Sequence, residues 1–126
     1  MERGVEKEKV RKWKHMDNER DPHGKSSKEP GAKLDAGKPP LYRGMLDYFP
    51  LALSAVAQVS AVGAEKYDWK GWESVPDGVN RYSDALLRHL AKESFELYDV
   101  DTGQLHAAQV AWNALARLEL LIRGRI

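Results

Sequence analysis

Two helix-like stretches, residues 78–98 and 104–123, carry polar side chains where a buried helix should be apolar. Both stretches repeat apolar residues at the 3.6-residue period of an amphipathic helix. Histidine, carboxylate and amide groups nevertheless fall on or beside these apolar faces. Buried polar groups are costly unless they are paired or hold an ion. The two stretches therefore predict a helical domain with a polar site between adjacent helices.

The first stretch, residues 78–98, carries three polar side chains that can meet. Glu93 projects into the apolar face, and His89 and Glu96 lie on its shoulder. At ~100° per residue, spacings of four and three residues bring the three side chains together above one helix. This arrangement predicts a cluster of two carboxylates and an imidazole.

The second stretch, residues 104–123, is apolar on nearly every side. Its one polar interruption is a strip whose members are spaced by three, four and four residues: His106, Gln109, Asn113 and Arg117. A helix that is apolar on both sides of a polar strip is packed on both sides, so the strip should line a site. A turn at residues 99–103 joins the two stretches, and antiparallel packing should place Glu93 near His106.

Carboxylates and imidazoles in one place are typical of a metal site. Carboxylates suit Mg²⁺ or Mn²⁺, and imidazole ligands shift the preference towards Mn²⁺ or another transition ion. We expect His89, Glu93, Glu96 and His106 to hold the metal, and His89, Glu93 and His106 to take part in catalysis. The simpler interpretation is that each histidine is a satisfied core residue and that the glutamates are surface charge. P-loop, dinucleotide-binding, zinc-protease and serine-nucleophile motifs are absent from the sequence.

Bulk properties narrow the class of protein. A chain of 126 residues has room for one domain core. The chain has no cysteine, which excludes disulfides and thiolate chemistry and fits a cytoplasmic location. The net charge of +1 predicts no stable nucleic-acid partner. The apolar runs are too short to span a membrane, and the N-terminus lacks the apolar core of a secretory signal.

The remaining chain divides by composition. We expect residues 1–30 to be a flexible charged arm, because they are rich in charge, glycine, serine and proline. Residues 31–50 contain glycines and prolines that exclude a long regular element. Pro50 suits a helix start, and residues 51–67 have near-helical apolar spacing. With no strand pattern, the domain is predicted to be all-α. Nucleic-acid binding by the basic arm is an alternative, although interleaved acids argue against it.

Two loop regions carry candidate ligand-binding residues. Residues 33–38 place two lysines and an acid between glycine and proline, either as a phosphate or ribose clamp or as a plain surface loop. Residues 66–72 place a cation beside two tryptophans, which either stack on a base or close the core. The candidates in these regions are Lys33, Asp35, Lys38, Lys66, Trp69 and Trp72.

Five motifs, in this order, resemble the phage-borne dATP/dGTP diphosphohydrolase family, which is similar to the MazG-type nucleotide pyrophosphohydrolases. The motifs are Gly31–Pro39, Gly63–Tyr67 with a following tryptophan, Arg81–Leu90, Asp101–His106 and Trp112-Asn113. The resemblance implies that residues 31–126 form an all-α, MazG-like helical bundle with an irregular N-terminal segment. It also implies hydrolysis of a purine (deoxy)nucleoside triphosphate to the monophosphate and pyrophosphate, with Mg²⁺ or Mn²⁺.

This chain departs from the acidic motifs of MazG-type enzymes. Glu93-x-x-Glu96 is the nearest match to their Glu-Glu-x-x-Glu, and His106-x-x-Gln109 stands where Glu-x-x-Asp is usual. Compensation by Glu65, Asp99 or Asp101 stays open, as does a degenerate protein that only binds nucleotides or a helical partner.

The expected substrate contacts come partly from the polar strip and partly from the family motifs. Arg117 and Asn113 should contact phosphate or sugar, and Arg88 recurs in the family motif. Asp84 points away from the inferred site, so it should cap, pair with a nearby arginine or reach a neighbouring subunit. Because the first and third helices have more apolar surface than one small chain covers, we expect a homodimer or homotetramer.

Overall fold

The computed structural model describes residues 19–125, which divide into two compact units between residues 48 and 49. Residues 1–18 of the arm expected at 1–30 lie outside the described residues. Among residues 19–125, no helix combines the length and apolar character that crossing a bilayer needs.

The described part of the first unit is built around a buried aspartate. The Asp21 carboxylate accepts hydrogen bonds from the backbone N–H of His23 at 2.6 Å and of Lys33 at 2.8 Å. These two bonds, that from Lys33 first, hold the pKa of Asp21 below its usual value. A single π-helical turn, η2 (Tyr42–Leu46), follows the Gly/Pro-rich stretch. This unit matches the irregular N-terminal segment that the sequence predicts.

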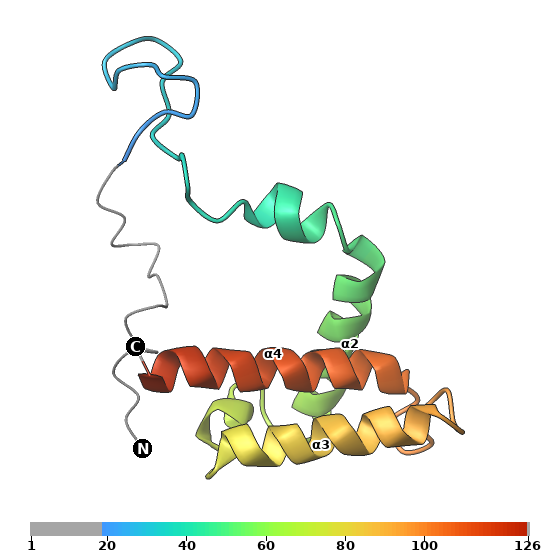
Figure 1. Cartoon of the computed structure of the whole chain (residues 1–126). Coiled ribbons are helices and arrows are strands. Elements are labelled where there is room, and N and C mark those ends of the chain that lie inside the picture. The colour runs from blue at the N-terminus through green and yellow to red at the C-terminus, as the bar shows by residue number, and fades with distance from the viewer. Residues whose placement is uncertain (1–18, 126) are drawn as a thin grey trace. The chain divides into compact units, whose positions relative to one another are not determined.

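The second unit contains three α-helices and one short 3-10 helix. They are α2 (Pro50–Lys66), η3 (Gly71–Ser74), α3 (Gly78–Glu93) and α4 (His106–Arg125). Pro50 is the first residue of α2, as its missing N–H and fixed φ favour. Within the described residues there is no strand beyond one isolated bridge, so the all-α prediction is confirmed. Helices α3 and α4 lie side by side and run in opposite directions (Figure 1).

The α3 helix ends earlier than the sequence suggests. The expected helix reached residue 98, whereas α3 stops at Glu93. The Ser94 hydroxyl donates to the carbonyl of Ala91 at 2.7 Å, and the Ser94 N–H donates to the same carbonyl at 3.2 Å. Serine competes in this way with the regular backbone ladder. Glu96 therefore lies in the turn and not on the helix, which corrects the expectation that three side chains converge above one helix.

Aromatic side chains hold the three helices of the second unit together. Trp112 on α4 packs edge-on against Trp72 at 6.2 Å and against Tyr82 at 5.6 Å between ring centroids. Its indole N–H donates to the Ser60 hydroxyl of α2 at 2.8 Å. Tyr82 donates its hydroxyl to the Trp72 carbonyl at 2.8 Å. This cluster joins α2, η3, α3 and α4, and it lies on the same two long helices as the polar site.

Candidate metal centre

A tight turn brings the ends of α3 and α4 together. The N–H of Asp99 donates to the Gln104 carbonyl at 2.8 Å, and the N–H of His106 donates to the Leu97 carbonyl at 3.1 Å. Gly103 has a φ of 75°, a left-handed conformation that glycine adopts without strain. These backbone bonds fix residues 97–106 as an ordered loop. The turn therefore places Asp99 beside His106, the first residue of α4.

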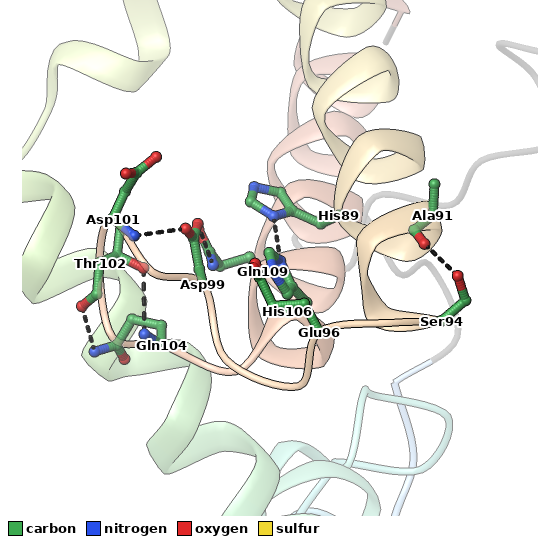
Figure 2. A network of polar contacts seen from close by, with 10 residues as sticks. All are labelled: His89, Ala91, Ser94, Glu96, Asp99, Asp101, Thr102, Gln104, His106 and Gln109. Atoms are coloured by element: carbon green, nitrogen blue, oxygen red, sulfur yellow. Dashed lines mark hydrogen bonds and ion pairs between the residues drawn. The ribbon is translucent and has the colours of Figure 1, made fainter.

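Two imidazoles face one another where the turn closes. The Nδ1 atoms of His89 on α3 and His106 on α4 are 2.9 Å apart (Figure 2). On its other side, the Nε2 atom of His106 lies 2.6 Å from Oε1 of Glu96. His106 is completely buried, whereas His89 and Glu96 are half-buried. The three residues form a chain of polar contacts from α3 through α4 to the turn.

A buried carboxylate completes the cluster. Asp99 is 6% exposed, and its two oxygens accept hydrogen bonds from the Asp101 N–H at 2.9 Å and the Gln109 side-chain amide at 3.0 Å (Figure 2). Gln109 is itself buried, and its backbone carbonyl accepts a bond from Asn113 at 2.8 Å. The amide of Gln109 therefore orients the Asp99 carboxylate at the start of α4.

The electrostatics of the cluster favour a neutral imidazole beside an ionised carboxylate. Burial is the main cause that lowers the pKa of His89, and the nearby His106 adds to it, while Asp99 opposes both. Burial raises the pKa of Asp99, but the Asp101 N–H, the Gln109 amide and the two imidazoles outweigh burial and hold it below its usual value. Both shifts make His89 more readily neutral, and Asp99 more readily ionised, than the free side chains.

These groups have the composition of a metal site. His89, Asp99 and His106 each offer one ligand atom, and the three atoms all lie within 4.8 Å of one another. Two imidazole nitrogens and one carboxylate oxygen form a donor set that divalent transition ions accept and that leaves positions for water or substrate. The chemistry of the residues present thus fits a bound divalent cation.

The structure brings together three of the four residues expected to hold a metal. His89, Glu96 and His106 are joined by direct polar contacts. Glu93 is half-buried and is the last residue of α3, one helical turn beyond His89. The four residues as a ligand set stay a prediction.

The polar strip of α4 continues away from the cluster. Asn113 is buried and bonded to the Gln109 carbonyl, and the exposed Arg117 donates its Nε–H to the Ser83 hydroxyl at 2.7 Å. Every buried side-chain nitrogen and oxygen in the described part of the chain has a hydrogen-bond partner. The strip is thus satisfied within the fold.

The other candidates of the second unit lie outside the histidine cluster. Lys66, at the end of α2, lies 5.4 Å from the centre of the Tyr67 ring. Trp69 is 65% exposed, whereas Trp72 packs on Trp112 and accepts the guanidinium of Arg123 over its ring at 5.4 Å.

The two candidates in the middle of α3 are both exposed. They are Asp84 and Arg88. Within residues 19–125, no ion pair joins Asp84 to Arg81 or Arg88. A role for Asp84 towards a neighbouring subunit stays a prediction.

The loop candidates belong to the first unit and are described within it alone. Lys38 forms an ion pair with Glu19 at 2.8 Å, with both side chains close to half-exposed. Lys33 is exposed, and its backbone N–H, not its ammonium, holds Asp21. Asp35 is half-buried, and its carbonyl accepts a turn bond from Lys38 at 3.1 Å. Their role as a phosphate or ribose clamp stays a prediction.

Asp99 is the residue that helical periodicity alone does not find. It lies in a turn, where side-chain direction does not follow from a period of 3.6 residues. The available signal was the pair of aspartates at 99 and 101 in the turn before His106, together with the shortage of carboxylates on the two helices. That shortage left Asp99 as one of three open candidates.

Comparison with known families bears on this site. The family described as dATP/dGTP diphosphohydrolase, N-terminal, matches residues 28–126. The chain belongs to this family. The match includes the loop at 33–38, the helices and the whole histidine cluster. No curated protein and no solved structure matches the chain.

Proposed function

We propose that this protein hydrolyses dATP or dGTP to the nucleoside monophosphate and pyrophosphate, with Mg²⁺ or Mn²⁺ as the cofactor. Membership of the dATP/dGTP diphosphohydrolase family supports the substrate class. The observation that carries the proposal is the approach of His89, Asp99 and His106 to within 4.8 Å of one another. Because the substrate is a cytoplasmic metabolite, we also propose that the protein acts in the cytoplasm.

The residues of the site divide into holding and proton-accepting roles. His89, Asp99 and His106 would hold the cation, which neutralises charge on phosphate oxygens and makes water a better nucleophile. Glu96 keeps the His106 ring in place through its contact with Nε2. Glu93 lies on the same face of α3 as His89, and we assign it as the base that takes the proton of the attacking water. The water oxygen bonds to the α-phosphorus, and the bond from the α-phosphorus to the bridging oxygen breaks to release pyrophosphate.

Basic and aromatic residues would bind the rest of the substrate. Arg117 is the exposed end of the polar strip and carries a forked guanidinium that suits phosphate oxygens. The buried Asn113 would contact phosphate or sugar from the inner side of the site. The exposed Trp69 would stack on the purine. Lys66 and Arg88 would bind further phosphate oxygens, Trp72 is the alternative to Trp69 beside the base, and Asp84 would act towards the site of a neighbouring subunit. Within the first unit, Lys33, Asp35 and Lys38 would form the expected clamp for phosphate or ribose.

The test is product analysis on a panel of nucleoside and deoxynucleoside triphosphates, with Mg²⁺ and then Mn²⁺. We expect cation-dependent release of monophosphate and pyrophosphate, fastest with dATP or dGTP. Chromatography that separates these products from diphosphate plus phosphate distinguishes attack at the α-phosphorus from attack at the γ-phosphorus. Release of diphosphate, or no turnover by the folded protein with either cation, would contradict the proposal.

A second candidate is a protein that binds nucleotides without hydrolysing them. The observation in its favour is that the buried polar side chains already satisfy one another, as a structural network does. Calorimetry would measure nucleotide binding. Binding by calorimetry with no turnover in the product assay would favour this candidate.

We also propose that the chain works as a homodimer or homotetramer. The buried hydrophobic side chains within the described residues are Ala108 and Ala116 alone. On α4, Leu115, Leu118 and Ile122 follow a helical stripe and are 42%, 52% and 41% exposed. Apolar stripes of this kind mark interaction surfaces.

Light scattering coupled to gel filtration tests the oligomer. We expect a mass of two or four chains, and Leu118→Lys should shift the protein towards the monomer because it places a charge in the apolar stripe. Val100→Lys, at an exposed position of the turn outside this stripe, adds the same single charge and is the control. A monomeric wild-type protein at every concentration tested would contradict the proposal.

A further inference from the structure

The cluster of His89, Asp99 and His106 differs from the all-carboxylate sites that suit Mg²⁺. We propose that these three residues form a centre selective for a divalent transition-metal ion over Mg²⁺, with Glu96 as the positioning residue for His106. The inference names the class of ion, and it rests on the proposed function only for the part that the ion plays in hydrolysis.

The spacing of the two imidazoles fits a shared ion. Ligand nitrogens lie about 2.0–2.1 Å from a transition ion such as Zn²⁺, so two adjacent ligands are separated by about 3.3 Å at a tetrahedral angle and by about 2.9 Å at a right angle. The Nδ1 atoms of His89 and His106 are 2.9 Å apart. The same two atoms therefore can either share a proton or bind one ion.

The contact with Glu96 selects the tautomer that a metal needs. A carboxylate is an acceptor, so the 2.6 Å contact places the His106 proton on Nε2. The Nδ1 lone pair of His106 is then directed at His89 and not at the turn. Metal-ligating histidines nearly always donate their second N–H to a carboxylate or carbonyl in this way.

Hydrogen bonds also orient the carboxylate of Asp99. Each of its oxygens accepts one hydrogen bond, from the Asp101 N–H and from the Gln109 amide. A carboxylate oxygen has two lone pairs, so one on each oxygen remains for an ion. The Gln109 amide has no charge with which to compete for that ion. Asp99 is thereby a ligand held in place by two neutral donors.

The donor set and its burial decide between the classes of ion. Mg²⁺ prefers oxygen ligands and keeps several waters, whereas imidazole suits Mn²⁺, Fe²⁺, Co²⁺ and Zn²⁺. Two of the three donors here are imidazole nitrogens, and only one is a carboxylate oxygen. The centre should therefore bind a transition ion more tightly than Mg²⁺.

The experiment titrates the metal-free full chain with Co²⁺, Mn²⁺, Zn²⁺ and Mg²⁺ by calorimetry, with visible absorption of Co²⁺ as a second readout. We expect one Co²⁺ per chain with ligand-field bands, and Mg²⁺ binding at least about 100-fold weaker. Glu96→Gln should weaken Co²⁺ binding by about 10- to 100-fold, as loss of an outer carboxylate does. Asp99→Asn, which preserves the shape of the side chain, should weaken it more.

The matched control is Asp101→Asn, which changes an exposed acid in the same turn and keeps the backbone N–H that holds Asp99. It should bind Co²⁺ like the wild type. Equal affinity for Mg²⁺ and Co²⁺, or unchanged Co²⁺ binding by Asp99→Asn, would overturn the inference. Unchanged Co²⁺ binding by Asp99→Asn, together with Mg²⁺-dependent hydrolysis of dATP, would overturn the inference while the proposed hydrolysis stands. Tight Co²⁺ binding without turnover of any nucleotide would support the centre and contradict the function.

Discussion

Replacing Glu93 with glutamine is expected to slow the release of pyrophosphate from dATP or dGTP by about 100- to 10,000-fold, the usual contribution of a general base. Glutamine has the shape of glutamate but cannot accept the proton of the attacking water. Glu93 closes α3 one turn after His89, and it is half-buried. Because His89, Asp99 and His106 form the metal centre, Glu93→Gln should bind the cation as tightly as the wild type.

The control for this prediction is Glu119→Gln, which removes the charge of an exposed glutamate on α4 whose partner is Arg123. It should leave the rate of pyrophosphate release unchanged. Single-turnover kinetics at saturating cation would separate a loss of chemistry from a loss of substrate binding. If Glu93→Gln hydrolyses dATP at the wild-type rate, Glu93 is not the base. If it also loses the cation, Glu93 belongs to the ligand set that the sequence first indicated.

The helices could be predicted from the sequence because their signals are local. Pro50 predicted the start of α2, and the apolar period predicted that α3 begins at residue 77 or 78. The short turn at 99–103 predicted the antiparallel pair, and the contact between His89 and His106 follows from that pairing. In each case the residues that form the sequence pattern are also the residues that form the helix start or the turn.

The end of α3 and the role of Asp99 could not be predicted in this way. Serine is tolerated in helices, so the period alone continues past Ser94 to Tyr98. The structure ends the helix because the Ser94 hydroxyl bonds the Ala91 carbonyl and the chain then pairs Leu97 with His106. That backbone pairing is a tertiary effect that also turns Asp99 towards Gln109. The candidate site therefore depends on contacts across the turn, and such contacts leave no periodic pattern in the sequence.

Replacing Trp112 with alanine is expected to be the most destabilising single change in the second unit. Trp112 packs edge-on against Trp72 and Tyr82 and donates to the Ser60 hydroxyl. Removing a large aromatic ring from such a position costs about 3–5 kcal/mol. Domains of this size are stable by about 5–15 kcal/mol, so the loss is a large fraction of the free energy of unfolding. Urea unfolding followed by far-UV circular dichroism, at a fixed chain concentration, measures it.

Two further variants separate the ring from its hydrogen bond. Ser60→Ala removes the partner of the indole N–H and should cost about 1 kcal/mol, the usual net contribution of one hydrogen bond. Trp112→Phe retains most of the edge-on packing and should lose less than Trp112→Ala. If Trp112→Phe and Trp112→Ala lose the same free energy, the ring contacts with Trp72 and Tyr82 contribute little. Because the cluster joins α2 and η3 to the two helices that carry His89 and His106, Trp112→Ala should also weaken cation binding through loss of the folded state.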